Sequence, residues 1–532
     1  MCIGILRSGL VIAVISCLAA SDNQAAPLFE RLYVQNQVLP GASALPGFNA
    51  VDTARDNGNR SLVTAPNGNF VVTVNTDPTQ GNAGFVGTFY HFGSTDQGIT
   101  PTALRRESTI AGQEQETFSS NGIDNAGNIT YTATIKNPSA PPTRFGSLWE
   151  NDTLIFRHGD AITTGPLAGN FFASASGAYR SPTGISNWIS SYSDTSLGAS
   201  TGSALFRSTT NFDVLLKSGD MIGTEGTIVS ESGAILANIR WSDSGNNYIT
   251  EVDLEAGFTA TEDLLVINGQ PATTPSGAVI RKGNAVSAID GGLSGETWDL
   301  SGLYDINNTG DFIFSAFNDG VVNDSVLALN GAIIHRENEV VDGVSLSGQV
   351  QGVAINDIGD IAYVWNDTLF INDQVIAGLG TLVDTNADGV GDTPITNQAL
   401  GQIEITNLPA AGGDLPVVYL GLDVGGLTSQ IRLIPAFADF DDDDDIDGRD
   451  FLIWQRGYGT GTSRAEGDAN WDGLVDESDL AIWQARYGQT APGGTLSGVL
   501  VRVPEPTSLS IILVALVCLG IYRGQLHATL QI

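Results

Sequence analysis

Short turns rich in Asn, Asp or Ser and closing on glycine recur along the middle of the chain. They lie at 65–69, 124–128, 242–246, 307–311 and 356–360. Asn and Gly suit tight turns because they accept positive φ. Alternating apolar segments follow most of these turns, as at 70–74, 129–135, 312–316 and 361–365. Alternation of β-branched and aromatic residues predicts strands.

The spacing of these turns indicates a repeat. The glycines at 68, 127, 245, 310 and 359 are separated by 59, 118, 65 and 49 residues, and 118 is twice 59. A second apolar element recurs at 153–160, 214–220, 264–269 and 368–373. A degenerate period of roughly 50–60 residues predicts a mainly β, six- or seven-bladed β-propeller-like repeat domain over 28–435. Its last unit is ragged, and a β-solenoid or two stacked sandwiches are the alternatives.

Charge narrows the possible partners. The chain has 59 acidic and 23 basic residues and a formal net charge of −36, which argues against nucleic-acid binding. Its four histidines are scattered singly, so no histidine-built zinc site is expected.

The N-terminus has the pattern of a signal peptide over 1–26, with Arg7 before an apolar stretch at 9–20. A lipoprotein signal with Cys17 lipidated is the alternative. The other cysteines, Cys2 and Cys518, also lie in the end segments. An exported body would therefore contain no disulfide.

A duplicated acidic loop lies near the C-terminus, with copies at 439–450 and 468–479 that are offset by 29 residues. Each copy is followed by similar text that contains Trp454 or Trp483. Calcium takes about six to eight oxygens, and a loop of about 12 residues supplies them from positions 1, 3, 5, 7, 9 and 12. The predicted ligands are Asp439, Asp441, Asp443, Asp445 (carbonyl), Asp447 and Asp450 in the first copy, and Asp468, Asn470, Asp472, Leu474 (carbonyl), Asp476 and Asp479 in the second.

The two copies differ at position 6, where the loop turns sharply. Gly473 suits this position, whereas Asp444 is strained there by about 1 kcal/mol, so the second loop should be the better formed. A solvated acidic run is the alternative for 441–445. We expect both tryptophans to be core residues, the alternative being an exposed partner anchor.

Two loop–helix repeats that end on Asp resemble a type I dockerin domain, here over 438–489. The resemblance implies calcium-dependent attachment to a cohesin-like module. Loop positions 10 and 11, which are Gly448, Arg449, Glu477 and Ser478, would contact that partner.

The C-terminus contains Pro504, Glu505 and Pro506, followed by an apolar stretch at 508–523 that is expected to be a transmembrane helix. It resembles a PEP-CTERM sorting signal, and 490–506 is expected to be a linker. The resemblance implies an exosortase-type processing protease and export to the cell surface or extracellular matrix. A plain C-terminal membrane anchor is the alternative. The middle of the chain resembles repeat domains of PEP-CTERM-type bacterial surface proteins. This resemblance implies no particular activity.

A further acidic loop at 384–392 offers Asp384, Asn386, Asp388 and Asp392 as weaker calcium ligands, and an ordinary Asx-rich turn is the alternative. The chain contains no Gly-x-Ser-x-Gly elbow, no His-Glu-x-x-His and no phosphate loop. The sequence therefore favours a non-catalytic exported protein of the cell surface or matrix, with extracellular polysaccharide as a further candidate partner. A secreted carbohydrate-active enzyme of the glycoside hydrolase type is the alternative.

Overall fold

The computed structural model describes residues 28–34, 51–53, 62–65, 70–76, 87–92, 102–106, 109–110, 113–136, 144–208, 212–229, 235, 239–254, 263–386, 391–397, 403–409, 415–434, 438–441, 446–470 and 474–488. The expected signal peptide, the linker, the Pro-Glu-Pro motif and the apolar stretch at 508–523 lie outside these ranges. Within them, no helix is long and apolar enough to cross a bilayer.

The described strands form seven sheets of four or more strands, which we number as blades 1 to 7. Blade 1 contains β2 (Val51–Thr53), β3 (Leu62–Thr64), β4 (Phe70–Thr76), β5 (Gly87–Phe92) and β6 (Thr102–Arg106). Blade 2 contains β7 (Thr109–Ile110), β8 (Gln113–Ile123), β9 (Ile129–Lys136), β10 (Arg144–Glu150) and β11 (Thr153–Arg157). Blade 3 contains β12 (Phe171–Phe172), β13 (Ser176–Arg180), β14 (Ser186–Ser193), β15 (Gly202–Ser208) and β16 (Phe212–Lys217).

The other four blades follow in chain order, except that the first strand of the chain joins the last blade. Blade 4 contains β19 (Arg240–Trp241), β20 (Tyr248–Asp253), β21 (Asp263–Ile267) and β22 (Gln270–Pro271). Blade 5 contains β23 (Leu300–Ile306), β24 (Phe312–Phe317), β25 (Ser325–Leu329) and β26 (Ala332–Arg336). Blade 6 contains β29 (Val350–Ile355), β30 (Ile361–Trp365), β31 (Thr368–Ile371) and β32 (Gln374–Ala377). Blade 7 contains β1 (Phe29–Val34), β33 (Leu382–Asp384), β34 (Thr393–Asn397), β35 (Ile403–Pro409), β36 (Pro416–Val424) and β37 (Leu427–Leu433).

Shorter elements lie between the blades and after them. Two further sheets have two strands each, β17 (Met221–Ile222) with β18 (Gly226–Thr227) and β27 (Val340–Val341) with β28 (Val344–Ser345). A 3-10 turn, η3 (Ala288–Asp290), precedes blade 5. After blade 7 come the helices α1 (Gly448–Gly457) and α2 (Glu477–Arg486), with the 3-10 turn η4 (Arg464–Glu466) between them.

The hydrophobic cores lie between successive blades and close the blades into a ring. Separate clusters of buried side chains join blades 1 and 2, 2 and 3, 3 and 4, 4 and 5, and 5 and 6. The next cluster joins blades 6 and 7 and also contains Phe70 of blade 1, whose ring lies 5.1 Å from that of Tyr419 in blade 7. Seven blades that share cores in this way form a β-propeller.

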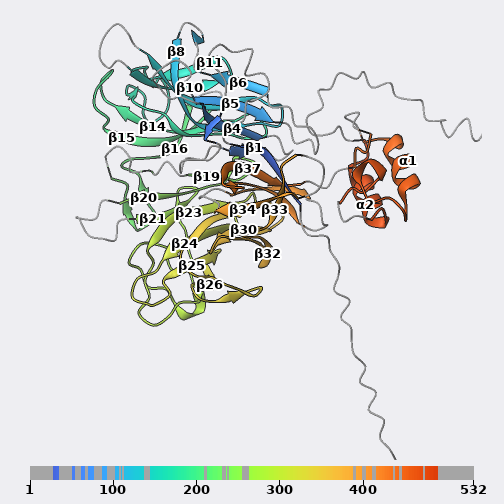
Figure 1. Cartoon of the computed structure of the whole chain (residues 1–532). Coiled ribbons are helices and arrows are strands. Elements are labelled where there is room, and N and C mark those ends of the chain that lie inside the picture. Colours follow the sequence, from blue (N-terminus) through green and yellow to red (C-terminus); the bar gives the residue numbers. More distant parts are fainter. Residues whose placement is uncertain are drawn as a thin grey trace, which may run out of the picture. The chain divides into compact units, whose positions relative to one another are not determined.

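The ring is closed by a strand from the opposite end of the chain. β1 pairs antiparallel with β37 and parallel with β33, and Figure 1 shows the blue β1 beside the orange β37. A buried ion pair joins the two strands, with 2.8 Å between the Arg432 guanidinium and Glu30 Oε2. The repeat pattern did not predict that the first strand of the chain would join the last blade.

An asparagine recurs at the same place in four of the blades. Four asparagines with φ of 48–51° occupy the turn between the last two strands of their blades: Asn151, Asn268, Asn330 and Asn372. Each side-chain oxygen accepts a hydrogen bond from the first N–H of the strand that follows the glycine turn, at 2.9–3.1 Å. Each amide donates to a side chain at the end of that turn or directly after it. The asparagine thus holds two hairpin turns of one blade together.

Candidate functional site

The two acidic loops each lead into a helix, and loop position 9 begins that helix. Asp447 and Asp476 are the N-cap residues of α1 and α2, and each accepts a hydrogen bond from the N–H two residues later, at 2.6 and 2.7 Å. In return, Asp450 and Asp479 accept from the N–H of these caps at 2.7 and 2.8 Å. Such capping boxes stabilise the first helical turn.

Loop position 12 also fastens the start of each loop. The other carboxyl oxygens of Asp450 and Asp479 accept from Phe440 N at 2.6 Å and Ala469 N at 2.7 Å. Both aspartates are fully buried. A single carboxylate therefore joins the beginning of a loop to the beginning of its helix.

The first loop brings three carboxylates to one point. The structure places oxygens of Asp439, Asp441 and Asp450 within 4.8 Å of one another, and it contains no other such group of three acids, histidines or cysteines within the described ranges. Two ligands at about 2.4 Å from one calcium ion lie at most about 4.8 Å apart. The geometry and the oxygen donors of these three residues therefore fit calcium.

For the other predicted ligands, the structure gives no such convergence of oxygen atoms within the described residues. Asp443, Asp445 and Asp472 lie outside the described residues. Asp468 and Asn470 are buried, whereas the side chain of Leu474 is exposed, which leaves its carbonyl as the predicted ligand atom. Burial raises the pKa of Asp450, and the charge of Asp447 adds to this effect, so a bound cation would stabilise the ionised carboxylate.

The two loop–helix repeats pack reciprocally. The Trp454 indole N–H donates to Asp476 O at 2.7 Å, and the Trp483 indole N–H donates to Asp447 O at 2.9 Å. Each tryptophan thus caps the other repeat where its helix begins. Trp454 is buried and Trp483 half-buried in a small core around Phe451, as expected for core residues.

The predicted partner residues lie on the surface of this pair. Gly448, Arg449, Glu477 and Ser478 occupy the first turns of α1 and α2 and are all exposed. Two exposed tyrosines, at positions 458 and 487, were not predicted to take part, although they recur at the same offset of 29 residues. The Tyr458 hydroxyl donates a hydrogen bond to the carboxylate of Glu477, which places it beside the partner residues of α2.

The acidic loop after β33 has the hydrogen bonds of an Asx turn. Asp384 is buried and accepts from Asn386 N at 3.1 Å. Asp392 accepts from the hydroxyls of Thr385 and Thr393 at 2.7 and 2.6 Å. Asp388 lies outside the described residues, so calcium binding at this loop stays a prediction.

The structure also contains a second cluster of polar side chains, which the sequence analysis did not predict. Strands β19, β23, β29 and β35 of blades 4 to 7 contact one another in succession. The glycine turns after β19, β23 and β29 contribute their second residues, Asp243, Asn308 and Asp357, which lie beside Asn407 of β35. We call these four residues the axial cluster. Asn407 Nδ2 lies 3.0 Å from Asp243 Oδ2 and 2.9 Å from Asp357 Oδ2, and Asn308 donates its N–H and its amide to Asp357 at 2.8 and 2.6 Å. The shared position of Asp243, Asn308 and Asp357 in the repeated turn is the signal that could have identified them.

Charged side chains lie beside the axial cluster. Arg240 of blade 4 binds Glu404 of blade 7 at 2.8 Å and lies 3.9 Å from Asp305 of blade 5. Burial raises the pKa of Asp305 to about 6. Burial, together with the charges of Asp357, Asp305 and Glu404, raises the pKa of Asp243 to about 8.

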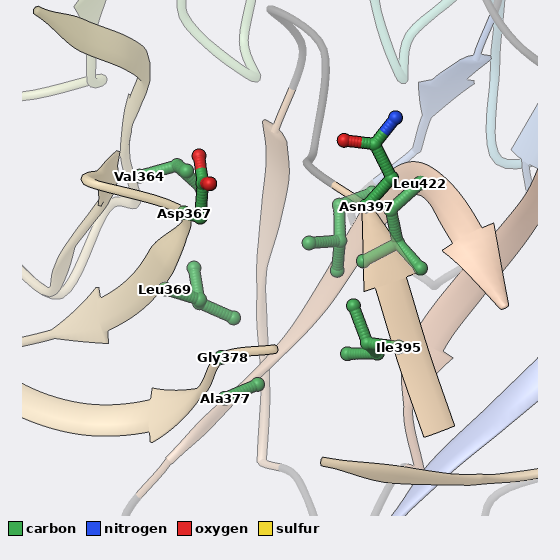
Figure 2. Close-up of a pocket in the computed structure, with 9 residues that line it drawn as sticks. Val364, Asp367, Leu369, Ala377, Gly378, Ile395, Asn397 and Leu422 are labelled. Carbon is green, nitrogen blue, oxygen red and sulfur yellow. The ribbon is translucent and has the colours of Figure 1, made fainter. Parts of the chain in front are cut away.

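A small cavity lies between blades 6 and 7. Figure 2 shows Asp367 and Asn397 at one end of it, above the apolar side chains of Leu369, Ile395 and Leu422. Its volume of about 20 Å³ admits about one water molecule. It is therefore too small for a sugar ring.

No protein-family model matches the chain, and no curated protein matches it. Several solved structures resemble it in fold. The β-propeller domain of the Trilobed protease from Pyrococcus furiosus is 8% identical, with 70% of this chain and 90% of that chain covered and a TM-score of 0.37. Trypanosoma rangeli sialidase is 9% identical, with 76% and 59% covered and a TM-score of 0.32. The α-L-arabinanase of Penicillium chrysogenum is 9% identical, with 75% and 97% covered and a TM-score of 0.25. These values are too low to transfer an activity.

Proposed function

We propose that the chain is a non-catalytic exported protein of the cell surface or extracellular matrix, which attaches to a cohesin-like partner through a calcium-dependent module at 438–489. The observation that carries this proposal is the convergence of Asp439, Asp441 and Asp450 within the reach of one ion, in a duplicated loop–helix unit. Export through 1–26, and sorting by an exosortase-type protease through the Pro-Glu-Pro motif at 504–506, complete the proposal on the grounds of sequence.

Calcium would act on the partner surface through loop position 12. Asp450 is one of the three converging carboxylates of the first loop. It is also the third residue of α1, next to Arg449. An ion held by this carboxylate fixes the first turn of the helix, where the partner residues lie. Metal binding and ordering of the docking surface are then a single event.

Binding to a purified type I cohesin module tests this function. The full chain is expected to bind it in millimolar calcium and to lose binding in EGTA. Asp472→Ala removes a position-5 ligand and should weaken calcium binding by about tenfold or more, a loss of at least 1.4 kcal/mol. Asp444→Ala, at position 6, is the control and should have a smaller effect in calorimetric titration. The reverse order would refute the ligand register, and normal calcium binding without cohesin binding would refute the partner.

One observation favours a second candidate, a carbohydrate-active enzyme. Asp243, Asp305, Asp357 and Glu404 lie together in the middle of the ring, and glycoside hydrolysis uses two carboxyl groups. A polysaccharide-hydrolysis screen on the full chain separates the two functions. Under the main proposal we expect no turnover. Reproducible turnover that Glu404→Gln abolishes would establish the enzyme instead.

A further inference from the structure

The axial cluster joins blades that are not neighbours in the ring. Asp243 follows β19 of blade 4, and Asn407 lies in β35 of blade 7, yet they are 3.0 Å apart. Arg240 and Glu404 make a second link between the same two blades. Blades 5 and 6 lie between them along the chain. These contacts therefore cross the middle of the ring and stabilise it in a way that the cores between adjacent blades do not.

The hydrogen bonds between members of the axial cluster do not neutralise the negative charge of its carboxylates. Asp243 Oδ2 and Asp357 Oδ2 are both bonded to the neutral amide of Asn407. The other ionisable groups that face Asp243 are the carboxylates of Asp305 and Glu404 and the hydroxyl of Tyr179, which donates to the Asp243 carbonyl. Arg240, which lies beside the axial cluster, is bonded to Glu404.

We propose that Asp243 holds a proton where Asn407 joins it to Asp357, and that this proton locks blade 4 to blades 6 and 7 until the surroundings become alkaline. A proton on Asp243 removes the repulsion between its carboxyl and the nearby carboxylates of Asp357, Asp305 and Glu404. An ionised pair would instead push apart the two turns that Asn407 holds together. The lock requires no ligand and acts within the ring itself.

The sign of the pH dependence follows from linkage. The folded pKa of Asp243, about 8, lies above its ordinary value of 3.8. The folded chain therefore holds a proton that the unfolded chain has already lost between these two values, and stability falls as the pH rises towards 8. Above that pH both states have lost the proton, and the dependence on pH ends.

Thermal unfolding of the full chain in calcium, between pH 5 and 9, tests the lock. Asp243→Asn replaces the protonated carboxyl with a neutral amide. The melting temperature of this variant should match that of the natural chain near pH 5 and exceed it by at least about 5 °C at pH 8.5. Asp311→Asn is the matched control, because hydrogen bonds from Thr309 and Asn330 lower the pKa of that turn aspartate. Its difference from the natural chain should not change between pH 6 and 9.

Asp357→Asn provides a second, independent test. It removes a charge that raises the pKa of Asp243, so it should reduce the loss of stability towards alkaline pH. The proposal is overturned if both variants lose stability with rising pH as steeply as the natural chain does. It is also overturned if the Asp311→Asn control shows the same gain at pH 8.5 as Asp243→Asn.

Discussion

Removal of calcium with EGTA is expected to unfold residues 438–488 while the blades stay folded. Without an ion, the carboxylates of Asp439, Asp441 and Asp450 repel one another within 4.8 Å, and the core of the two repeats is too small to compensate. Trypsin reports the change, because Arg464 and Arg486 are only 2% and 7% exposed in the folded unit. Cleavage after both arginines should be slow in calcium and fast in EGTA.

Two controls accompany the digestion. Readdition of excess calcium should restore the protection of Arg464 and Arg486, since the unfolding is reversible metal loss. Arg432, which is fully buried in blade 7, should stay protected in both conditions. Continued protection of Arg464 and Arg486 in EGTA would show that the unit folds without the ion.

Glu251→Gln is expected to stabilise the β region by about 3 kcal/mol at pH 8.5 and to have little effect near pH 4. Glu251 is 6% exposed in β20, and within the described part of the chain its Oε1 atom has no hydrogen-bond partner. Burial, assisted by the charge of Asp263, raises its pKa from the usual 4.5 to about 7, and this rise corresponds to about 3 kcal/mol.

The direction follows from the proton balance. Stability from a raised carboxyl pKa is complete below the unfolded value and is lost as the pH rises through 7, because the folded state must then hold a buried charge. The neutral amide avoids this loss. Urea unfolding of the full chain at pH 4 and pH 8.5 measures it, and an equal effect at the two pH values would contradict the assignment.

Glu296 offers a matched control for that experiment. It is also buried, but both of its carboxyl oxygens bind Arg336 at 2.8 Å, and hydrogen bonds from Arg336, Leu293 and Asn318 lower its pKa. Glu296→Gln should therefore destabilise the chain by about 3 kcal/mol at pH 8.5, since it leaves a part-buried guanidinium without its ionic partner. Opposite signs for two buried glutamates would separate the effect of charge from that of burial.

Local pattern was sufficient to predict several of the strands and the turns before them. The alternating segments at 129–135, 312–316 and 361–365 lie in β9, β24 and β30, and the glycine turns precede them as expected. Seven blades fall within the predicted six or seven. The offset of 29 residues also indicated two equivalent loop–helix units, and α1 and α2 begin at equivalent positions.

Contacts between distant residues were not predictable in the same way. Glu30 and Arg432 are separated by 402 positions, and neither has a local feature that marks it as a partner. The axial cluster depends on how blades 4 to 7 are arranged around the ring, which no single repeat contains. The capping role of Asp447 and Asp476 was hidden because the same residues fit a ligand pattern.

Blade 7 is completed by β1, the first strand of the chain, and this pairing sets an order on the assembly of the ring. A chain that emerges N-terminus first presents β1 long before its partner β37 has appeared, since nearly four hundred residues separate Val34 from Leu427. Until β33 and then β37 have appeared, the edges of β1 lack their neighbours, and unpaired edges favour pairing with other chains. Completion of the ring must therefore wait for the last strand, so a chain cut short before 427 would leave β1 unpaired on that side.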